Sequence, residues 1–196
     1  MVINMLHRKE RFIVTTIEII DELGIQKLST REIARRQGVS EATLFRHYKN
    51  KNELLIAVLD NFSEFDKDIF QTVQLSECNP KKAIIQLIHL YAEYYENYPA
   101  ITSILQLFDV LRYEPELEDK IISISDGRTN VIKQLIEEAQ QASEINSNLD
   151  SEMVSVMIWG FFREICLKWR LENSKFSLKD RILSTLELLL DGFKLN

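Results

Sequence analysis

Side chains that can bind a nucleic acid are concentrated between residues 29 and 51. Leu44 is expected to be buried between the helices, so the side chains of Thr43, Arg46 and His47 beside it point away from that core. Hydroxyl, guanidinium and imidazole groups of this kind bind base edges and phosphates in the major groove of DNA. This stretch makes double-stranded DNA the first partner to consider.

The same stretch carries start and stop signals for short helices. Ser29, with Glu32 three residues later, forms a capping box that starts one helix, and Ser40 can cap the next. Gly38 lies between the two, where the chain must leave a helix in a left-handed conformation. Asn50 supplies a third cap. Three capped starts around a glycine turn are typical of a helix-turn-helix.

From about Arg8 to Leu59 the sequence resembles the DNA-binding domain of the tetracycline-repressor (TetR) family. The caps, the turn glycine, the groove residues and a terminal lysine coincide in the strings Gly38-Val39-Ser40 and Thr43-Leu44-Phe45-x-His47-Tyr48-Lys49-Asn50-Lys51. Beyond the first third of the chain, only the layout of helices is shared with the family. The resemblance implies a dimeric regulator that binds DNA and responds to a small molecule.

The resemblance implies DNA contacts for ten residues. Those expected to face the floor of the major groove, at the start of a recognition helix over about residues 41–47, are Ser40, Glu41, Ala42 and Thr43. Those expected to brace the DNA backbone are Phe45, His47 and Lys51. From the preceding helix, Thr30 and Arg31 are expected to touch phosphate, with a base contact left open. Arg46 could either face the groove or brace the backbone.

Two of these residues depart from the family pattern. The family usually has tyrosine where this sequence has Phe45, whose ring can pack but cannot donate a hydrogen bond to phosphate. Glu41 is unusual in a groove. It either accepts a hydrogen bond from a cytosine amino group or only stabilises the start of its helix through the macrodipole, and the sequence leaves both open.

Charge divides the chain into two parts. Residues 1–52 contain 10 Lys and Arg against 6 Asp and Glu, whereas residues 53–196 contain 14 against 24. Only the first part attracts a polyanion. The sequence therefore predicts a helix-turn-helix DNA-binding domain over residues 1–52 and an effector-binding and dimerisation domain over residues 53–196.

The pattern beyond the motif is helical. The chain has only 5 Gly and 3 Pro, and no run alternates in the manner of a strand. Helices are expected at about residues 5–23, 51–72, 80–97, 99–113, 116–142, 150–173 and 177–194. The predicted fold is all-α, an N-terminal three-helix helix-turn-helix domain joined to a larger helical domain that binds a ligand and dimerises.

The last two expected helices are apolar on more than one side. Such helices need two surfaces to pack against. Burial in one core and a four-helix bundle shared with a second copy both satisfy the pattern. The TetR resemblance implies the homodimer, with an interface formed by Val154, Ile158, Phe161, Ile165, Ile182, Leu186, Leu189 and Phe193. A two-fold dimer would place its recognition helices roughly 34–36 Å apart, which predicts a palindromic operator.

Aromatic and flexible side chains in the middle helices could line an apolar cavity for an effector. They are Tyr91, Tyr94, Tyr95, Leu107, Phe108, Leu111, Met157, Phe162 and Trp169. Core packing explains the same residues, and it is the family resemblance that implies a pocket. The sequence shows no buried basic cluster, which favours a small hydrophobic effector over a highly anionic one.

Other chemistry finds little support in the sequence. Cys78 and Cys166 form no CxxC pair, and the three histidines have no partner at metal-ligand spacing. No catalytic triad, phosphate-binding glycine loop, signal peptide or membrane-length apolar run is recognisable. We therefore expect no metal, no cofactor and no enzymatic activity, and a cytoplasmic location.

Three hypotheses about function follow. The first is a transcriptional repressor released from a palindromic operator by a small hydrophobic effector. The second is a DNA-binding protein of the same fold with no small-molecule effector, which acts through a protein partner. The third is an all-helical enzyme that retains a helix-turn-helix.

Overall fold

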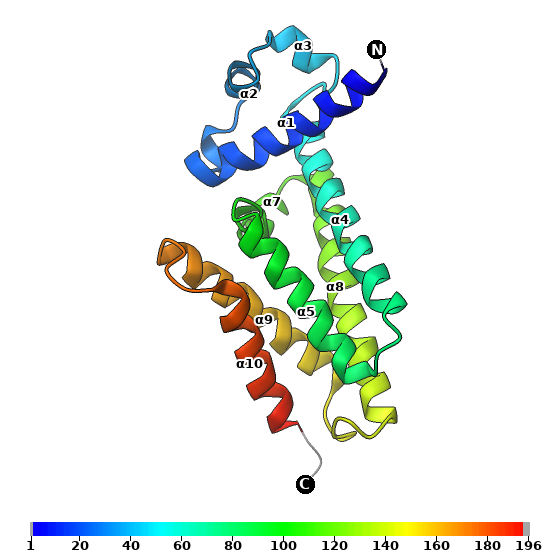
Figure 1. Cartoon of the computed structure of the whole chain (residues 1–196). Coiled ribbons are helices and arrows are strands. Elements are labelled where there is room, and N and C mark those ends of the chain that lie inside the picture. The colour runs from blue at the N-terminus through cyan, green and yellow to red at the C-terminus, as the bar shows by residue number, and fades with distance from the viewer. Residues whose placement is uncertain (1, 194–196) are drawn as a thin grey trace. The chain divides into compact units, whose positions relative to one another are not determined.

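The computed structural model describes residues 2–193, with side chains from residue 8 onward. Within that part of the chain every regular element is a helix, which confirms the all-α prediction (Figure 1). None of the described helices is long and apolar enough to span a membrane. The elements are α1 (Val2–Leu23), the 3-10 helix η1 (Ile25–Lys27), α2 (Thr30–Arg36), α3 (Glu41–Phe45), α4 (Lys51–Leu75), α5 (Pro80–Asn97), α6 (Ile101–Gln106), α7 (Phe108–Leu111), α8 (Pro115–Gln141), α9 (Ser151–Leu171) and α10 (Leu178–Gly192).

The chain forms two compact units. Unit 1 contains the residues up to Glu64 together with Ser103–Ile122, and unit 2 contains Phe65–Thr102 and the residues from Ser123 onward. Both α4 and α8 are continuous helices that belong partly to each unit. The predicted domain boundary after residue 52 falls in the first turn of α4, whose residues up to Glu64 pack with unit 1.

The predicted caps are present. Their side-chain oxygens accept backbone N–H donors three residues further on: Ser29 from Glu32 at 3.2 Å, Ser40 from Thr43 at 3.3 Å and Asn50 from Glu53 at 2.8 Å. Gly38 has a φ of 62°, in the left-handed region that glycine adopts without strain. The next N–H, of Val39, donates to the Ala34 carbonyl at 3.0 Å and closes α2.

The core of unit 1 holds the helix-turn-helix in shape. Leu44 is fully buried, as its place in the sequence predicts. It shares this core with apolar residues from α1, α2 and the start of α4, including Phe12, Ile17, Ile20, Ile33, Ala34, Leu54, Val58 and Leu59. Because α2 and α3 are only 7 and 5 residues long, packing of this kind supplies most of their stability.

The prediction of a single helix over residues 99–113 is wrong. The chain instead forms α6 and α7, separated at Leu107. There the hydrogen bonds shorten to three-residue spacing, with the Leu107 N–H donating to the Ile104 carbonyl at 3.1 Å. Phe108, the first residue of α7, is buried and packs edge-on against Phe62, with ring centroids 5.7 Å apart. No glycine or proline marks this break, so tertiary packing decides it.

In unit 2, α10 packs against α5 and α9 (Figure 1). Asn79 caps α5 by accepting the Lys82 N–H at 2.9 Å, and Pro80 takes the first helical position, as predicted. Aspartate and serine caps start the last two helices: Asp150 precedes α9 and Ser177 precedes α10.

Candidate functional site

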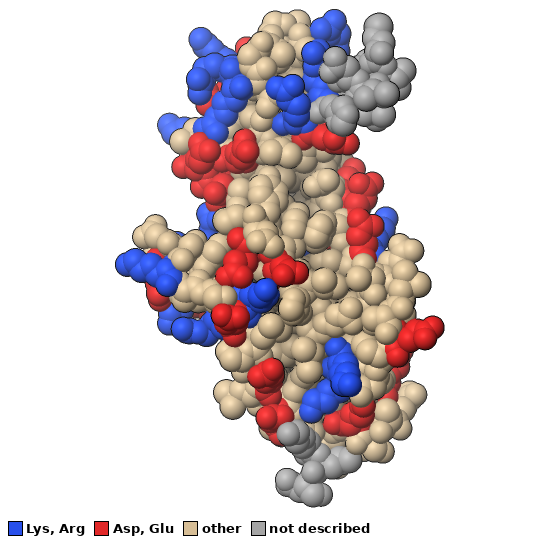
Figure 2. All heavy atoms as spheres, in the orientation of Figure 1, with Lys and Arg blue, Asp and Glu red and all other residues tan. Residues whose placement is uncertain are grey.

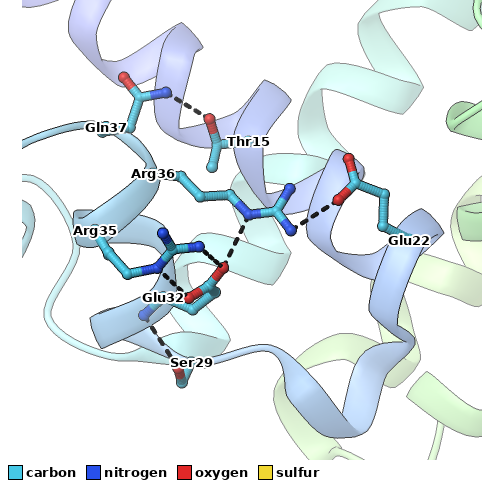
Figure 3. Close-up of polar contacts among 7 residues, drawn as sticks. All are labelled: Thr15, Glu22, Ser29, Glu32, Arg35, Arg36 and Gln37. Atoms are coloured by element: carbon cyan, nitrogen blue, oxygen red, sulfur yellow. Dashed lines mark hydrogen bonds and ion pairs between the residues drawn. The ribbon is translucent and has the colours of Figure 1, made fainter.

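Polar contacts join α1 to α2, the first helix of the helix-turn-helix motif (Figure 3). The Arg36 guanidinium spans the two helices, with Nη2 2.8 Å from a Glu22 oxygen in α1 and Nε 3.0 Å from a Glu32 oxygen in α2. The Gln37 amide donates to the Thr15 hydroxyl of α1. These contacts set the position of α2, whose last residues lead into the glycine turn and α3.

The Glu32 carboxylate is the centre of this network. Arg35 donates to both of its oxygens, at 2.7 and 2.8 Å, and Arg36 donates to one of them. Hydrogen bonds from Arg35 and then Arg36 lower the pKa of Glu32 to about 2. The carboxylate therefore stays ionised at every physiological pH, and Arg35 and Arg36 are engaged with it in the free protein.

An exposed hydrogen-bonded row runs along α3. The hydroxyl oxygens of Ser40 and Thr43 lie 3.1 Å apart, and Arg46 Nη2 donates to the Thr43 hydroxyl at 3.1 Å. Their three-residue spacing places them on one face of the helix. The row thus presents hydroxyl and guanidinium groups, which bind bases and phosphates, in a defined arrangement.

The recognition helix is shorter than predicted, because α3 ends at Phe45 rather than near residue 47. The His47 N–H turns back to the Leu44 carbonyl at 2.8 Å, which closes the helix with a tight final turn. Phe45 is exposed, and His47 is half-buried against Phe12, with ring centroids 5.7 Å apart. Lys51 is exposed at the start of α4.

Glu41 links the two helices of the motif. Its Oε2 accepts a hydrogen bond from the Thr30 hydroxyl at 2.9 Å, so the first residues of α2 and α3 are tied together. The sequence left two roles open for Glu41, binding a cytosine amino group or stabilising its helix. This contact supports the second role, because it uses a carboxylate oxygen within the motif, and a negative charge at a helix N-terminus is also favourable. Arg31 and Ala42 are exposed on either side of this link.

Positive charge surrounds these side chains. Figure 2 shows Lys and Arg side chains gathered over the part of unit 1 where Figure 1 labels α2 and α3. All ten residues predicted to contact DNA lie in unit 1, on α2, on α3, in the residues that flank α3 or, for Lys51, at the start of α4. The structure thus brings the predicted DNA-contact residues together on one small domain.

We expect His47 to make DNA binding sensitive to pH. Burial lowers the pKa of its imidazole below 6.5, and the nearby charges of Lys9, Arg8 and Arg46 lower it further, so the ring is neutral in the free protein above that pH. A DNA phosphate beside the ring would raise the pKa, so the complex would take up a proton. Affinity should then increase as pH falls from 8 to 6, by at most about ten-fold for a pKa rise of about one unit.

The measurement is the dissociation constant of the operator complex across this pH range. His47→Gln should remove the pH-dependent gain, whereas the control His89→Gln, on α5 of unit 2, should retain it. An unchanged pH profile in His47→Gln would show that this imidazole does not contact phosphate.

Unit 2 contains an aromatic core. Tyr91 contacts Tyr95, Trp159 and Phe162 edge-on, with ring centroids 6.3, 5.1 and 6.3 Å apart. Burial raises the pKa of the Tyr91 and Tyr95 hydroxyls, so both stay protonated. Tyr94 lies at the edge of this core, 5.6 Å from the Tyr95 ring. Four of the predicted pocket residues, Tyr91, Tyr94, Tyr95 and Phe162, are therefore in one cluster.

The other predicted pocket residues lie elsewhere. Leu107, Phe108 and Leu111 belong to unit 1. Trp169 is buried in unit 2 and donates its indole N–H to the Phe176 carbonyl at 2.8 Å, a contact that closes the α9–α10 connection. Met157 is 50% exposed on the outer face of α9, so we remove it from the pocket assignment.

A buried ion pair in unit 2 was missed by the sequence analysis. Arg128 of α8 donates from Nε and Nη2 to the two oxygens of Asp66 of α4, at 2.8 and 2.7 Å, and Tyr91 donates to the same carboxylate at 2.8 Å. Burial lowers the pKa of Arg128, but Tyr95, Tyr91 and Asp66 raise it by more, so the guanidinium stays charged.

The sequence did contain a signal for this pair. On α8, Arg128 falls four residues after Ile124 and four before Ile132, in the middle of the apolar stripe. On α4, Asp66 follows Phe62 by four residues and precedes Ile69 by three. A charged residue at such a position is directed into the core, where it needs a partner of opposite charge.

The predicted dimer interface needs revision. Four of its members, Val154, Ile158, Ile182 and Leu186, are at most 3% exposed within the chain itself. Side chains that one chain already buries add no area to an interface between two copies. The other four, Phe161, Ile165, Leu189 and Phe193, are partly exposed.

A neighbouring apolar face is exposed instead. We define the α9–α10 face as Met153, Val156, Met157, Phe161, Leu188, Leu189 and Phe193. It contains an apolar groove of about 450 Å³, lined by residues of both helices. Contiguous apolar surfaces of this kind mark interaction sites.

The two cysteines are described by their burial and hydrogen bonds. Cys166 is fully buried, and burial raises the pKa of its thiol to about 12, so it behaves as a small hydrophobe. Cys78 is half-buried and accepts a hydrogen bond from Ser76. Among the described residues, no group of three His, Cys, Asp or Glu side chains could hold a metal ion.

Comparison with known proteins identifies the class. Residues 12–58 match the family of bacterial regulatory proteins of the tetR type, and residues 60–192 match the C-terminal region of YsiA-like proteins. The chain belongs to the TetR family, and it is a DNA-binding transcriptional regulator.

Individual relatives resemble the whole chain. A fatty acid metabolism regulator protein of Bacillus subtilis is 28% identical over 181 residues, which cover 90% of each chain. The FadR regulator of B. subtilis, solved in complex with stearoyl-CoA, is 25% identical with a TM-score of 0.82, covering 94% of this chain and 98% of that one. A fatty acid degradation regulator FadR from Bacillus halodurans shares the fold, at 21% identity and a TM-score of 0.84 over 96% and 97% of the two chains. All three are regulators.

Proposed function

We propose that this protein is a dimeric repressor that binds a palindromic operator and leaves it when a long-chain fatty acyl-CoA binds to unit 2. The observation that carries the proposal is the similarity to the B. subtilis fatty acid regulator over 90% of both chains. The B. subtilis FadR structure adds the ligand class, because it holds stearoyl-CoA. As a reader of chromosomal DNA, the protein would act in the cytoplasm.

The interior of unit 2 is suited to an acyl chain. Its aromatic cluster is apolar apart from a few polar tips, the composition expected of a pocket for a hydrophobic ligand. A cavity of about 250 Å³ opens between α4, α5 and α8. Phe70, Val73 and Leu135 contribute to its apolar side, and its polar lining comes from Gln74, Glu77, Gln134 and Glu138. The sequence predicted a small hydrophobic effector, and we now propose more specifically a fatty acyl compound.

DNA binding is assigned to the ten residues of unit 1. The row of Ser40, Thr43 and Arg46 would read bases, with Ala42 beside it at the groove floor. Contacts to phosphate are assigned to Thr30, Arg31, His47 and Lys51, and Phe45 would pack against the DNA backbone. Glu41 would position Thr30 rather than read a base.

Dimerisation is assigned to the α9–α10 face. In a two-fold dimer this face would pack on its own copy, so that four helices form a bundle. Such symmetry is what a palindromic operator requires, because each recognition helix then meets an identical half-site.

The test starts with selection of binding sites from a random DNA library by the purified full chain. The expected product is a palindrome whose half-sites are roughly one DNA turn apart. Adding stearoyl-CoA should then release the selected DNA. A selected operator that stearoyl-CoA leaves bound would favour the hypothesis of a DNA-binding protein without this effector, and no enriched sequence would reject the operator claim.

Two substitutions should separate base reading from phosphate binding on the selected operator. Arg46→Ala should weaken specific binding by roughly 1–3 kcal/mol and relax the preference at one base pair. Lys51→Ala should weaken specific and non-specific binding about equally and flatten the salt dependence. The control is Lys67→Ala, at an exposed position of α4 in unit 2. An Arg46→Ala protein with unchanged selectivity would remove this residue from base reading.

A further inference from the structure

One buried side chain in unit 2 has an unused hydrogen-bond donor. Trp159 of α9 is 8% exposed, and among the described residues its indole Nε1 has no hydrogen-bond partner. Buried donors without an acceptor are rare in folded proteins and call for an explanation. The other tryptophan, Trp169, donates its indole N–H to the Phe176 carbonyl. One indole N–H therefore has an acceptor among the described residues, and the other has none.

The unused donor lies beside the buried ion pair. The guanidinium carbon of Arg128 is 5.2 Å from the centre of the Trp159 ring and 5.0 Å from that of Tyr91. Tyr91 in turn donates to Asp66, the partner of Arg128. Tyr91 and Arg128 already donate to Asp66, so the Trp159 N–H in the same region is left to bind an oxygen acceptor on a hydrophobic ligand.

The cavity between α4, α5 and α8 comes close to this group. Phe70, which lines the cavity, packs edge-on against Tyr91, with ring centroids 6.4 Å apart. One aromatic ring thus separates the cavity from the Tyr91 ring. An acyl chain in the cavity could therefore extend past Phe70 and lie among the rings of the aromatic cluster.

Charge decides which oxygen fits. Asp66 already neutralises Arg128, so a second carboxylate in this buried region would bring an uncompensated negative charge. A thioester carbonyl is neutral and still accepts a hydrogen bond. The region therefore favours the carbonyl of an acyl thioester over the carboxylate of a free fatty acid.

We propose that Trp159, next to Arg128, forms the subsite for the thioester carbonyl of the acyl effector. The indole N–H donates to the carbonyl oxygen, and the acyl chain runs among the aromatic rings toward the cavity beside Phe70. This subsite rests on the proposed function, which supplies the acyl-CoA class. It adds a specificity-determining residue, because a ligand without the carbonyl would leave the indole N–H without an acceptor.

The first measurement follows the two indole N–H signals of the 15N-labelled full chain by NMR. Trp159→Phe and Trp169→Phe assign the signals, because each removes one of them. Saturation with stearoyl-CoA should move the Trp159 proton downfield as it gains an acceptor, and the Trp169 proton should stay in place. A Trp159 signal that does not move at saturation would overturn the subsite.

The second measurement is ligand affinity by calorimetry. Trp159→Phe should bind stearoyl-CoA about ten-fold more weakly, the value of one hydrogen bond. Because phenylalanine also removes part of a ring packed against Tyr91 and Phe162, the unfolding transition should shift to lower denaturant, and ligands with and without the carbonyl then separate the lost hydrogen bond from the lost packing. The control Trp169→Phe, which loses the bond to Phe176, should retain wild-type affinity. Equal affinity of Trp159→Phe and wild type would overturn the proposal.

A matched ligand tests the carbonyl itself. S-octadecyl-CoA has a methylene in place of the thioester carbonyl, and it should bind wild type about ten-fold more weakly than stearoyl-CoA but bind Trp159→Phe no worse than wild type. Stearate tests the other oxygen source. If stearate shifts the Trp159 signal and binds more tightly than stearoyl-CoA, the thioester assignment is wrong. If wild type binds none of the three, both the acyl effector and this subsite fail, while a selected operator would still support DNA binding.

Discussion

Leu188→Glu is expected to convert the dimer into folded monomers at micromolar concentration and to abolish tight operator binding. Leu188 is 76% exposed in the single chain, so a glutamate there is solvated and the fold is retained. In a two-fold dimer through the α9–α10 face, the same carboxylate would be buried without a partner in each copy. A buried unpaired charge costs about 3–5 kcal/mol, and symmetry makes the dimer bear that cost twice.

Light scattering after size exclusion gives the mass, and circular dichroism reports whether the helices remain. Leu75→Glu is the matched control, because Leu75 is 74% exposed on α4, outside this face, and the variant should stay dimeric. Leu186→Glu gives the contrast, since Leu186 is fully buried and the charge should unfold the chain itself. A wild type that is monomeric, or a dimeric Leu188→Glu variant, would contradict the interface.

Arg128→Met is expected to destabilise unit 2 by about 3–5 kcal/mol, measured as the free energy of unfolding in urea. The reason is that Asp66 would remain buried with its negative charge unpaired. Removing both partners in the double variant Asp66→Leu with Arg128→Met should recover most of that loss, because an apolar pair of similar volume needs no desolvation of charge.

The control for this cycle is an exposed ion pair of the same unit. Lys133 Nζ of α8 lies 3.1 Å from Glu152 Oε2 of α9, and Lys133→Met should destabilise the chain far less than Arg128→Met, because water screens exposed charges. If Arg128→Met and Lys133→Met cost the same, Asp66 does not carry an uncompensated charge in the variant. If the double variant is as unstable as Arg128→Met alone, the loss comes from packing rather than charge.

Local chemistry made the DNA-binding motif predictable from the sequence. Ser29, Ser40 and Asn50 cap helices because their short side chains reach an N–H three residues away, and this needs no distant contact. Gly38 is similarly determined, because few other residues adopt its positive φ without strain. The site on unit 1 follows from such signals, because all of its residues come from one continuous stretch of 22 positions, Thr30 to Lys51.

The tertiary structure alone decided which apolar side chains face outward. On α9, Ile158 and Met157 are adjacent and both apolar, yet the first is fully buried and the second is 50% exposed. Hydrophobic periodicity fixes the angle between them but not which side meets the chain's own core. The packing of α10 against α5 and α9 makes that choice, and it left Leu188 on the surface while it buried Leu186. The dimer face and the Asp66–Arg128 pair have this in common: each depends on which helices become neighbours, and helical spacing within one segment carries no information about its neighbours.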